Sequence, residues 1–399
     1  MKRTLSYVLV TPYTIAKNRI GGILARLISQ TGLELAGCQM IAADEELTRA
    51  YAEQLRKRNA SNDTTLLADY VEQNLGPSGG QKHRSLLLLF RGEAPCDKLA
   101  AVIGSLCPER RELNEVAGET IRDTYADLIT DKADPKKVVY FEPAALTPWE
   151  QEWADKDLAL FSRFLKNQEN IVNNRPKGDS TQIEQTLVIL KPDNWQYASS
   201  KPGAVIDMFS RTGARIVGLK VHRFSLAEAL EFYGPVEGVL REKLAPIFGG
   251  KARKLLEKEF GVELDDTLER SLSETFGVRY ARDQFDQIIK FMSGIQREEC
   301  PPEKANDPGD VKCMILIYEG ENVIQKIRDV LGPTDPLKAP GGTVRREFGS
   351  NVMVNTAHAS DSAESMEREK KIVKIDQNPL GGIIDSYLAK QKQEADEQG

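Results

Sequence analysis

Near the end of this 399-residue chain, the stretch Asn355-Thr356-Ala357-His358-Ala359-Ser360-Asp361-Ser362 surrounds a histidine with small and polar residues. The chain contains three histidines in all. This one follows an apolar run, residues 352–354, and precedes an acidic segment typical of a helix. A histidine has a free lone pair at neutral pH, so one held at a junction between a strand and a helix has the chemistry of a nucleophile.

Upstream of His358, residue types that suit phosphate chemistry follow one another in order. Phosphoryl transfer needs a nucleophile, cations that neutralise phosphate oxygens, and polar groups that align the nucleotide. Charged and hydrogen-bonding residues of this kind include Lys191, Arg328, Thr334 and Arg345. A single histidine at the end of a strand is more often structural, and we interpret His83 and His222 in that way. The joint occurrence of the set around His358 favours a catalytic role there.

Several motifs in this region resemble those of nucleoside-diphosphate kinases. They are Lys191-Pro192-Asp193, Leu331-Gly332-Pro333-Thr334-Asp335-Pro336, Pro340-Gly341-Gly342-Thr343-Val344-Arg345 and the stretch around His358. The resemblance covers residues 185–375. It implies that His358 is the nucleophile that becomes phosphorylated and that Glu369 orients its ring. It also implies phosphoryl transfer between nucleoside triphosphates and diphosphates, with ping-pong kinetics.

The same resemblance implies roles for the remaining candidates. Arg328, Arg345 and Thr334 would hold the terminal phosphates. Lys191 and Asn355 would contact the ribose hydroxyls and the transferring group. Tyr233 would lie beside the phosphorylated histidine, and Phe285 would stack on the base. Magnesium (Mg²⁺) would arrive with the nucleotide, without a metal site of the protein's own.

The chain also repeats itself. Apolar strand patterns at residues 4–12, 33–41 and 85–91 have counterparts at residues 186–193, 214–224 and 312–319, with helix patterns between them. A last strand is expected at residues 137–141 in the first copy and 351–355 in the second. This order is a split βαβ pattern. We therefore predict an α+β protein, a tandem duplication of two ferredoxin-like α/β sandwich domains with antiparallel sheets.

The first copy lacks most of the chemistry-bearing residue types. Thr11 stands in place of Lys191, Ala100 in place of Arg328, Leu106 in place of Thr334, and roughly Ala145 in place of His358. Arg122 is retained as the partner of Arg345. Polar positions became small or apolar while the core pattern stayed, so we interpret the first copy as degenerate and non-catalytic.

The expected domain boundaries follow from the repeat. Residues 1–166 form the degenerate domain, residues 167–184 a polar linker, and residues 185–375 the catalytic domain. Insertions near residues 234–284 and 295–310 interrupt the catalytic domain, the second of them a surface loop. Residues 376–399 form a tail with one amphipathic piece, which docks either on a neighbouring subunit or on the first domain.

Composition narrows the remaining function classes. A net charge of −6 argues against a nucleic-acid-binding protein, and no apolar run reaches the length of a membrane span. The N-terminal sequence does not have the pattern of a signal peptide. The five cysteines are scattered along the chain, as expected of reduced thiols. We therefore expect a cytoplasmic protein. We predict a homo-oligomer in which the two copies of each chain form a pseudo-dimer. The alternatives are a non-enzymatic nucleotide-binding or scaffold protein and, more weakly, a protein-histidine phosphotransfer protein.

Overall fold

The computed structural model of the chain describes residues 2–58, 62–106, 118–134, 138–174 and 182–397. The chain divides into two compact units. The first unit consists of residues 1–221, 314–367 and 374–399, and the second of residues 222–313 and 368–373. Nearly all residues of both repeated sheets belong to the first unit.

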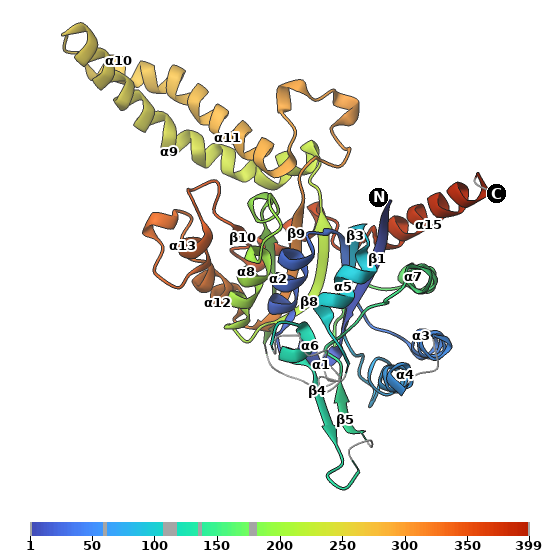
Figure 1. The fold of residues 1–399 in the computed structure, drawn as a ribbon. Coiled ribbons are helices and arrows are strands. Elements are labelled where there is room, and N and C mark those ends of the chain that lie inside the picture. Colours follow the sequence, from blue (N-terminus) through green and yellow to red (C-terminus); the bar gives the residue numbers. More distant parts are fainter. Residues whose placement is uncertain (1, 59–61, 107–117, 135–137, 175–181, 398–399) are drawn as a thin grey trace. The chain divides into compact units, whose positions relative to one another are not determined.

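The described elements follow the predicted order (Figure 1). The first copy contains β1 (Arg3–Val10), α1 (Pro12–Ala16), α2 (Ile20–Thr31), β2 (Glu34–Ile41), α3 (Glu45–Lys57), α4 (Asn62–Asn74), β3 (Ser85–Glu93), α5 (Pro95–Ile103), α6 (Ile121–Tyr125), β4 (Asp127–Thr130), β5 (Val138–Glu142), β6 (Ala145–Leu146) and α7 (Gln151–Leu165). The second contains β7 (Ile183–Leu190), η2 (Pro192–Asn194), α8 (Lys201–Ser210), β8 (Arg215–His222), β9 (Cys313–Glu321), α12 (Val323–Leu331), η6 (Pro336–Lys338), α13 (Val344–Phe348), β10 (Ala357–Ala359) and α14 (Ala363–Ile372), followed by α15 (Leu380–Asp396).

The two copies build sheets of the same topology. One sheet has the strand order β2-β3-β1-β6 and the other the order β8-β9-β7-β10. In each sheet, the first strand of the copy is antiparallel to the third and to the fourth. This is the strand arrangement of a ferredoxin-like sandwich, so the predicted fold class is confirmed for both copies.

The position of the fourth strand was predicted wrongly in both copies. Residues 138–142 do form β5, but β5 pairs with β4 in a separate hairpin, and the sheet strand is the two-residue β6. Val139 is 62% exposed, as expected of a hairpin outside the core. Residues 351–355 form a turn, in which the Asn351 side chain accepts from the backbone N–H of Met353 and Val354. An asparagine that satisfies its own following backbone favours a turn over a strand.

Helices α2 and α8 bring the two copies together. They belong to one continuous hydrophobic core that also takes residues from both sheets. The helices meet at Gly21 and Gly203, and a Cβ atom on Gly21 would lie 2.6 Å from the carbonyl oxygen of Gly203. A glycine at such a crossing lets two backbones approach closely. The copies are therefore packed as a pair within one chain.

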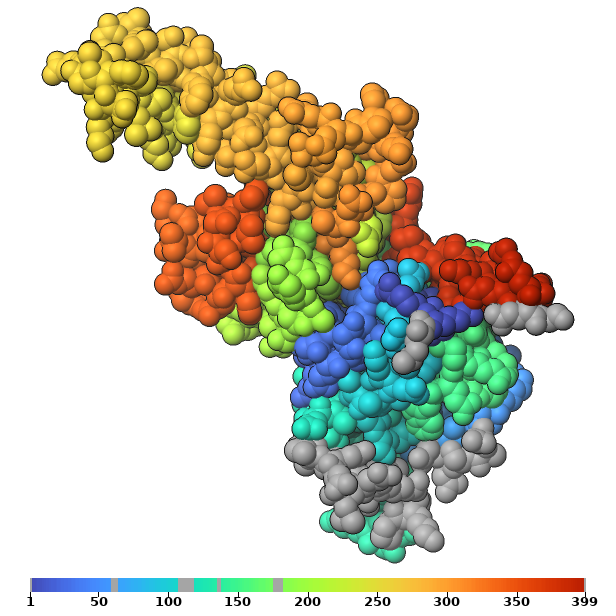
Figure 2. Space-filling model, turned by 45° about the horizontal axis from the view of Figure 1, so that its top comes forward, coloured from blue at the N-terminus to red at the C-terminus, as the bar shows by residue number. Residues whose placement is uncertain are grey.

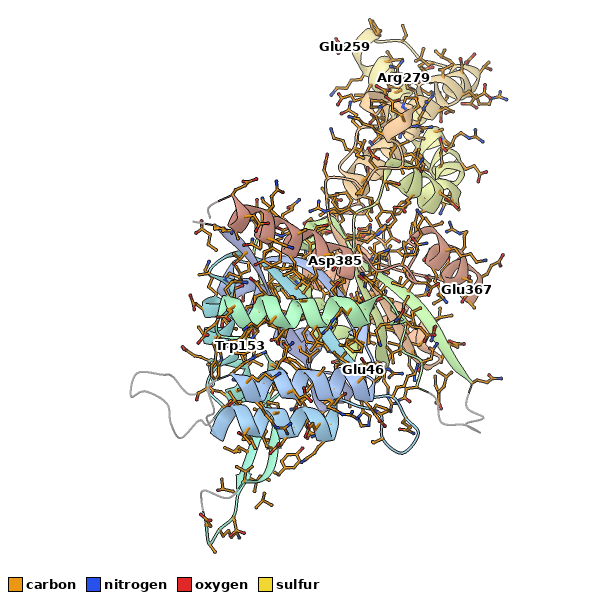
Figure 3. All side chains as sticks on the ribbon, turned by 90° about the vertical axis from the view of Figure 1, so that its right-hand side faces the viewer. Glu46, Trp153, Glu259, Arg279, Glu367 and Asp385 are labelled. Carbon is orange, nitrogen blue, oxygen red and sulfur yellow. The ribbon has the colours of Figure 1, made fainter. Side chains whose placement is uncertain are left out.

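The other face of the first sheet carries a second core, formed with α3, α4, α7 and α15. In Figure 3, Glu46, Trp153 and Asp385 mark α3, α7 and α15, and α7 lies beside both of the others. Helix α15 buries Leu380 and Ile384 completely, and the Tyr387 hydroxyl donates to Asp155 at 2.9 Å. Figure 2 shows this helix in red against the first copy. The tail therefore docks on the first copy of its own chain.

The second unit holds the long insertion as a helical hairpin. Its elements are α9 (Leu226–Phe260), α10 (Asp266–Leu272), the short π-helix η3 (Ser273–Gly277), α11 (Val278–Ser293), η4 (Arg297–Glu299) and η5 (Pro302–Lys304). Arg253 joins Glu257, Asp266 and Glu269 at 2.8–3.0 Å, and Phe248 stacks on Tyr280 at 4.1 Å. In the described part of the chain no helix combines the length and the apolarity required to cross a membrane.

Candidate active site

His358 lies in β10, directly opposite Ile189 of β7. The residue two positions before it, Thr356, has a φ of 74°, which is unusual for a β-branched side chain. Its carbonyl accepts from the Lys191 backbone N–H at 2.9 Å and from the Asn194 side chain at 2.7 Å. Strained backbone that the surroundings hold in place is common at functional sites. These contacts fix the strand that presents the half-buried His358.

The structure brings Lys191, Asn355 and Thr334 together. The Lys191 ammonium donates to the Asn355 Oδ1 at 2.6 Å, and the Asn355 amide donates to the Thr334 carbonyl at 3.1 Å. Lys191 is 8% exposed and Asn355 only 1%, whereas the side chain of Thr334 is exposed. The pair therefore ties the segment before His358 to the residue after β7 and to the loop after α12, and the Thr334 side chain stays exposed.

Arg345 lies in α13 and bridges the same loop to the same strand. Its guanidinium donates to the Gly332 carbonyl at 2.9 Å and to the Ala357 carbonyl at 3.1 Å. Ala357 immediately precedes His358, and Gly332 lies two residues before Thr334. Arg345 is half-buried. It thus combines a structural role with a positive charge beside the strand that carries His358.

Arg122 of the first copy forms the same bridge. Its guanidinium donates to the Gly104 carbonyl at 2.5 Å and to the Ala145 carbonyl at 3.1 Å. Gly104 ends α5 as Gly332 ends α12, with φ values of 88° and 81°. We call Arg122 and Arg345, with these carbonyl bonds, the arginine bridges. One of them persists in a copy that lacks the histidine.

The carboxylate of Asp361 interacts electrostatically with both Arg328 and His358. A hydrogen bond from Ser365 is the largest cause that lowers the pKa of Asp361, and the positive charge of Arg328 lowers it further. Arg328 is exposed in the last turn of α12. Neither Asp361 nor Asn194 was predicted as a site residue. Asp361 follows His358 by three residues, and Asn194 follows Lys191 by three, and this proximity in sequence was the available signal for them.

Three predicted site residues belong to the second unit: Tyr233, Phe285 and Glu369. Tyr233 is 8% exposed and Glu369 is 3% exposed, and their roles beside His358 remain predictions. Phe285 is 1% exposed. Both faces of its ring are therefore covered in this structure, and stacking on a base would require the ring to move.

The strand register corrects one equivalence between the copies. Ala145 pairs with Val10 and Leu146 with Leu9, whereas Ala357 pairs with Leu190 and His358 with Ile189. The counterpart of His358 is therefore Leu146, one residue beyond the predicted Ala145. The equivalence of Ala100 and Arg328 is retained, because each accepts through its carbonyl from the glycine that ends its helix, at 2.9 Å.

Two sheets of equal topology, one carrying a histidine among arginine, lysine and amide side chains, define a duplicated ferredoxin-like protein with one chemically equipped copy. Comparison with known proteins supplies the family. The protein-family description "Nucleoside diphosphate kinase" matches residues 267–377. A nucleoside diphosphate kinase of Anaeromyxobacter sp. (strain Fw109-5) is 30% identical over 186 residues, which are 47% of this chain and 86% of that relative. The chain belongs to the nucleoside diphosphate kinase family.

The chain is also similar to a further curated relative and to two solved structures. A nucleoside diphosphate kinase of Hyperthermus butylicus is 28% identical over 199 residues, covering 50% of this chain and 97% of that relative. The solved structure of the Aquifex aeolicus nucleoside diphosphate kinase shares 24% identity, with a TM-score of 0.29. That of an NDP kinase from Pyrobaculum aerophilum shares 28% identity, with a TM-score of 0.34. Each covers 48% of this chain and is itself covered to 94%.

Proposed function

We propose that the second copy transfers the γ-phosphoryl group of a nucleoside triphosphate to a nucleoside diphosphate through His358. A ring nitrogen of His358 attacks the γ-phosphorus, a P–N bond forms, and the bond to the β-phosphate oxygen breaks. The nucleoside diphosphate leaves with that electron pair. A terminal phosphate oxygen of a second diphosphate then attacks the phosphorus, and the P–N bond breaks to restore the imidazole. The two half-reactions give ping-pong kinetics.

The residues near His358 supply the positioning and charge that this transfer requires. Arg328 and Thr334 are exposed and would contact the terminal phosphates, with Arg345 adding its charge from the side of the strand. The Lys191–Asn355 pair would contact the ribose hydroxyls and the transferring group. Glu369 would hold the imidazole in the orientation for attack, and Tyr233 would flank it.

Magnesium fits this site as part of the nucleotide. Mg²⁺ in phosphoryl-transfer enzymes is commonly held by substrate phosphates with few protein carboxylates. Among the residues that the structure describes, no group of three or more His, Cys, Asp and Glu side chains is arranged to hold a metal ion. We propose that the ion arrives with the nucleotide, where it would neutralise charge that develops on the phosphate oxygens.

The first copy is proposed to contribute packing and no phosphoryl transfer. The aliphatic Leu146 is 1% exposed at the position of His358, and the Thr11 hydroxyl donates to buried Glu142 where Lys191 meets Asn355 in the second copy. Leu146 has no nucleophilic atom, and Thr11 is fully buried with its hydroxyl bonded to Glu142. We also propose that the protein is cytoplasmic, because Cys38, Cys96, Cys300 and Cys313 are free thiols. Whole chains are further proposed to pair with one another.

The observation that carries the proposal is His358 on β10, with Lys191, Asn355 and Arg345 tied to the backbone around it. The test is incubation with γ-³²P-labelled ATP. Wild type should acquire a label that is stable to alkali and lost in acid, and His358→Asn should acquire none. His83→Asn is the matched control and should label as wild type does. Equal labelling of the His358→Asn variant would refute the proposal.

One observation favours the alternative of a nucleotide-binding scaffold. Lys191 and Arg345 both donate to groups of the protein, so part of their capacity for phosphate is already used. A scaffold would bind a nucleoside diphosphate equally well with and without the His358→Asn substitution, and neither form would label. Label that moved to another protein in preference to a nucleoside diphosphate would instead identify a phosphotransfer protein.

A further inference from the structure

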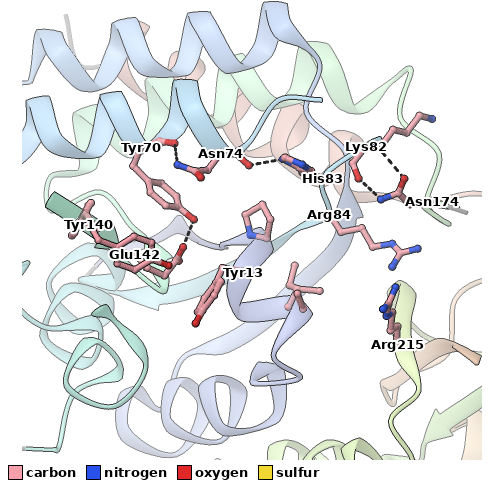
Figure 4. A pocket seen from close by; sticks show the side chains of 14 residues that line it. Tyr13, Tyr70, Asn74, Lys82, His83, Arg84, Tyr140, Glu142, Asn174 and Arg215 are labelled. Atoms are coloured by element: carbon pink, nitrogen blue, oxygen red, sulfur yellow. Dashed lines mark hydrogen bonds between the residues drawn. The ribbon is translucent and has the colours of Figure 1, made fainter. Parts of the chain in front are cut away.

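The first copy contains a cavity of about 380 Å³ that the proposed reaction does not use. Its walls come from α1, the end of α4, the segment before β3, strand β5 and the start of β8. Figure 4 shows its side chains, with Tyr13 in the middle and Arg84 and Arg215 at one end. We call it the first-copy pocket. Its volume lies within the range of small-molecule sites, about 300–1,000 Å³.

Positive charge gathers at one end of the first-copy pocket. Arg84 of the first copy and Arg215 of the second point toward each other in Figure 4. Burial and the charge of Arg215 lower the pKa of Arg84, and Glu319 opposes them. Arg84 is fixed in place by its bond to the Val172 carbonyl at 2.8 Å and its ion pair with Glu319 at 3.7 Å.

Arg215 is exposed and forms no ion pair with the residues that the structure describes. Lys82 adds a third cation at the rim; its ammonium lies 4.0 Å from Glu169. Glu319 offsets part of the charge of Arg84 but forms no ion pair with Arg215, and an arginine fork matches phosphate geometry. This end of the pocket therefore has the charge and the donors for a phosphate group.

The opposite part of the first-copy pocket is aromatic. Tyr13, Tyr70 and Tyr140 line it, and Tyr140 is 42% exposed. The one carboxyl group in the lining, Glu142, is 2% exposed and accepts from Thr11 and Tyr70 at 2.6 Å. Its oxygens are therefore engaged by the protein and do not oppose an anion at the far end. Tyrosine rings present flat surfaces on which a heterocycle can stack.

We propose that the first-copy pocket is a second binding site, for a nucleoside monophosphate or diphosphate, with the phosphate between Arg84 and Arg215 and the base against the tyrosines. The site needs both copies, because Arg84 and Arg215 come from different ones. None of its residues belongs to the set around His358. The proposed second site can therefore be tested independently of the phosphoryl transfer. The degenerate copy would then have lost the reactive histidine and kept a ligand site.

The test counts ADP molecules bound per full-length chain by equilibrium dialysis. Wild type should bind two equivalents. Arg215→Glu should weaken one of them about 10- to 100-fold, the loss expected for a charged contact, and leave the labelling of His358 unchanged. Arg163→Glu, an exposed change on α7, is the control and should bind two.

Further arms separate the phosphate from the base. Tyr140→Ala should weaken the second equivalent of ADP and leave inorganic pyrophosphate binding unchanged. Equal loss for both ligands, or none for either, would overturn the placement of the base. A single equivalent in wild type, or two undiminished equivalents in Arg215→Glu, would overturn the site itself. Neither result would contradict the proposed phosphohistidine reaction, because the labelling of His358 measures that reaction separately.

Discussion

The arginine bridges provide a pair of matched perturbations, Arg122→Met and Arg345→Met. Methionine keeps much of the aliphatic stem of arginine and removes its donors. Each bridge joins the glycine that ends a helix to the residue at the start of the fourth strand, Gly104 to Ala145 and Gly332 to Ala357. Both bridges belong to the same unit. Because the two copies also share one hydrophobic core, we expect either loss to lower the free energy of unfolding of that unit.

The expected size of the effect follows from the hydrogen bonds. Each bond from a charged donor contributes about 1.5–3 kcal/mol, so the two bonds common to both bridges contribute about 3–6 kcal/mol. The cost of burying a guanidinium against neutral carbonyls offsets part of this. We therefore expect each substitution to lower the free energy of unfolding by about 3 kcal/mol, with Arg122→Met the larger because Arg122 is 2% exposed.

Urea unfolding followed by circular dichroism measures both effects, and the labelling of His358 in folded protein separates them. Arg122→Met should destabilise and still label, because it lies in the copy without the histidine. Arg345→Met should destabilise and also label poorly. An Arg122→Met protein within about 0.5 kcal/mol of wild type, the range of ordinary surface changes, would refute the structural role of the bridges. Loss of labelling without loss of stability in Arg345→Met would leave Arg345 as a phosphate ligand alone.

Two further predictions concern acid stability and the tail. The pKa of Asp361 is lowered in the folded chain, so its stabilising effect is complete above its unfolded pKa, about 3.9, and is lost as the pH falls through the folded value. The urea midpoints of wild type and Asp361→Asn should therefore converge as the pH falls below the unfolded pKa, and a constant difference between pH 2 and 6 would contradict this. Leu380→Ala removes a fully buried side chain of α15 and should lower the free energy of unfolding by about 2–5 kcal/mol. Lys390→Ala on the same helix should leave the urea midpoint unchanged. Equal midpoints for the two variants would contradict the docking of α15.

Much of the fold was accessible from the sequence, because long apolar strands and amphipathic helices leave periodic patterns. The strands β1, β3, β7 and β9 began and ended within a few residues of their expected bounds. The fourth strands were missed because β6 has two residues and β10 three. Strands this short leave no period, and their place is set by pairing with a neighbour distant in the chain.

The site shows the same division between local and long-range signals. Lys191, Asn355 and Arg345 were predicted as site residues from motifs that resemble those of a known family. Their bonds to Thr356, Gly332 and Ala357 were not predictable, because they depend on backbone carbonyls that any residue can provide. Asn194 illustrates this: nothing in its type distinguishes it until its amide is seen to hold the Thr356 carbonyl. The docking of α15 on the first copy likewise depended on a surface formed by distant segments.

The central claim is that His358 carries the phosphoryl group between two nucleotides. Mass spectrometry of peptides from ATP-treated protein, before and after a chase with GDP, tests it directly. The account predicts one phosphate per chain on the peptide containing His358, and its disappearance on the chase with formation of an equal amount of GTP. Phosphate found on a peptide containing His83 or His222, or phosphate on His358 that GDP does not remove, would contradict the account.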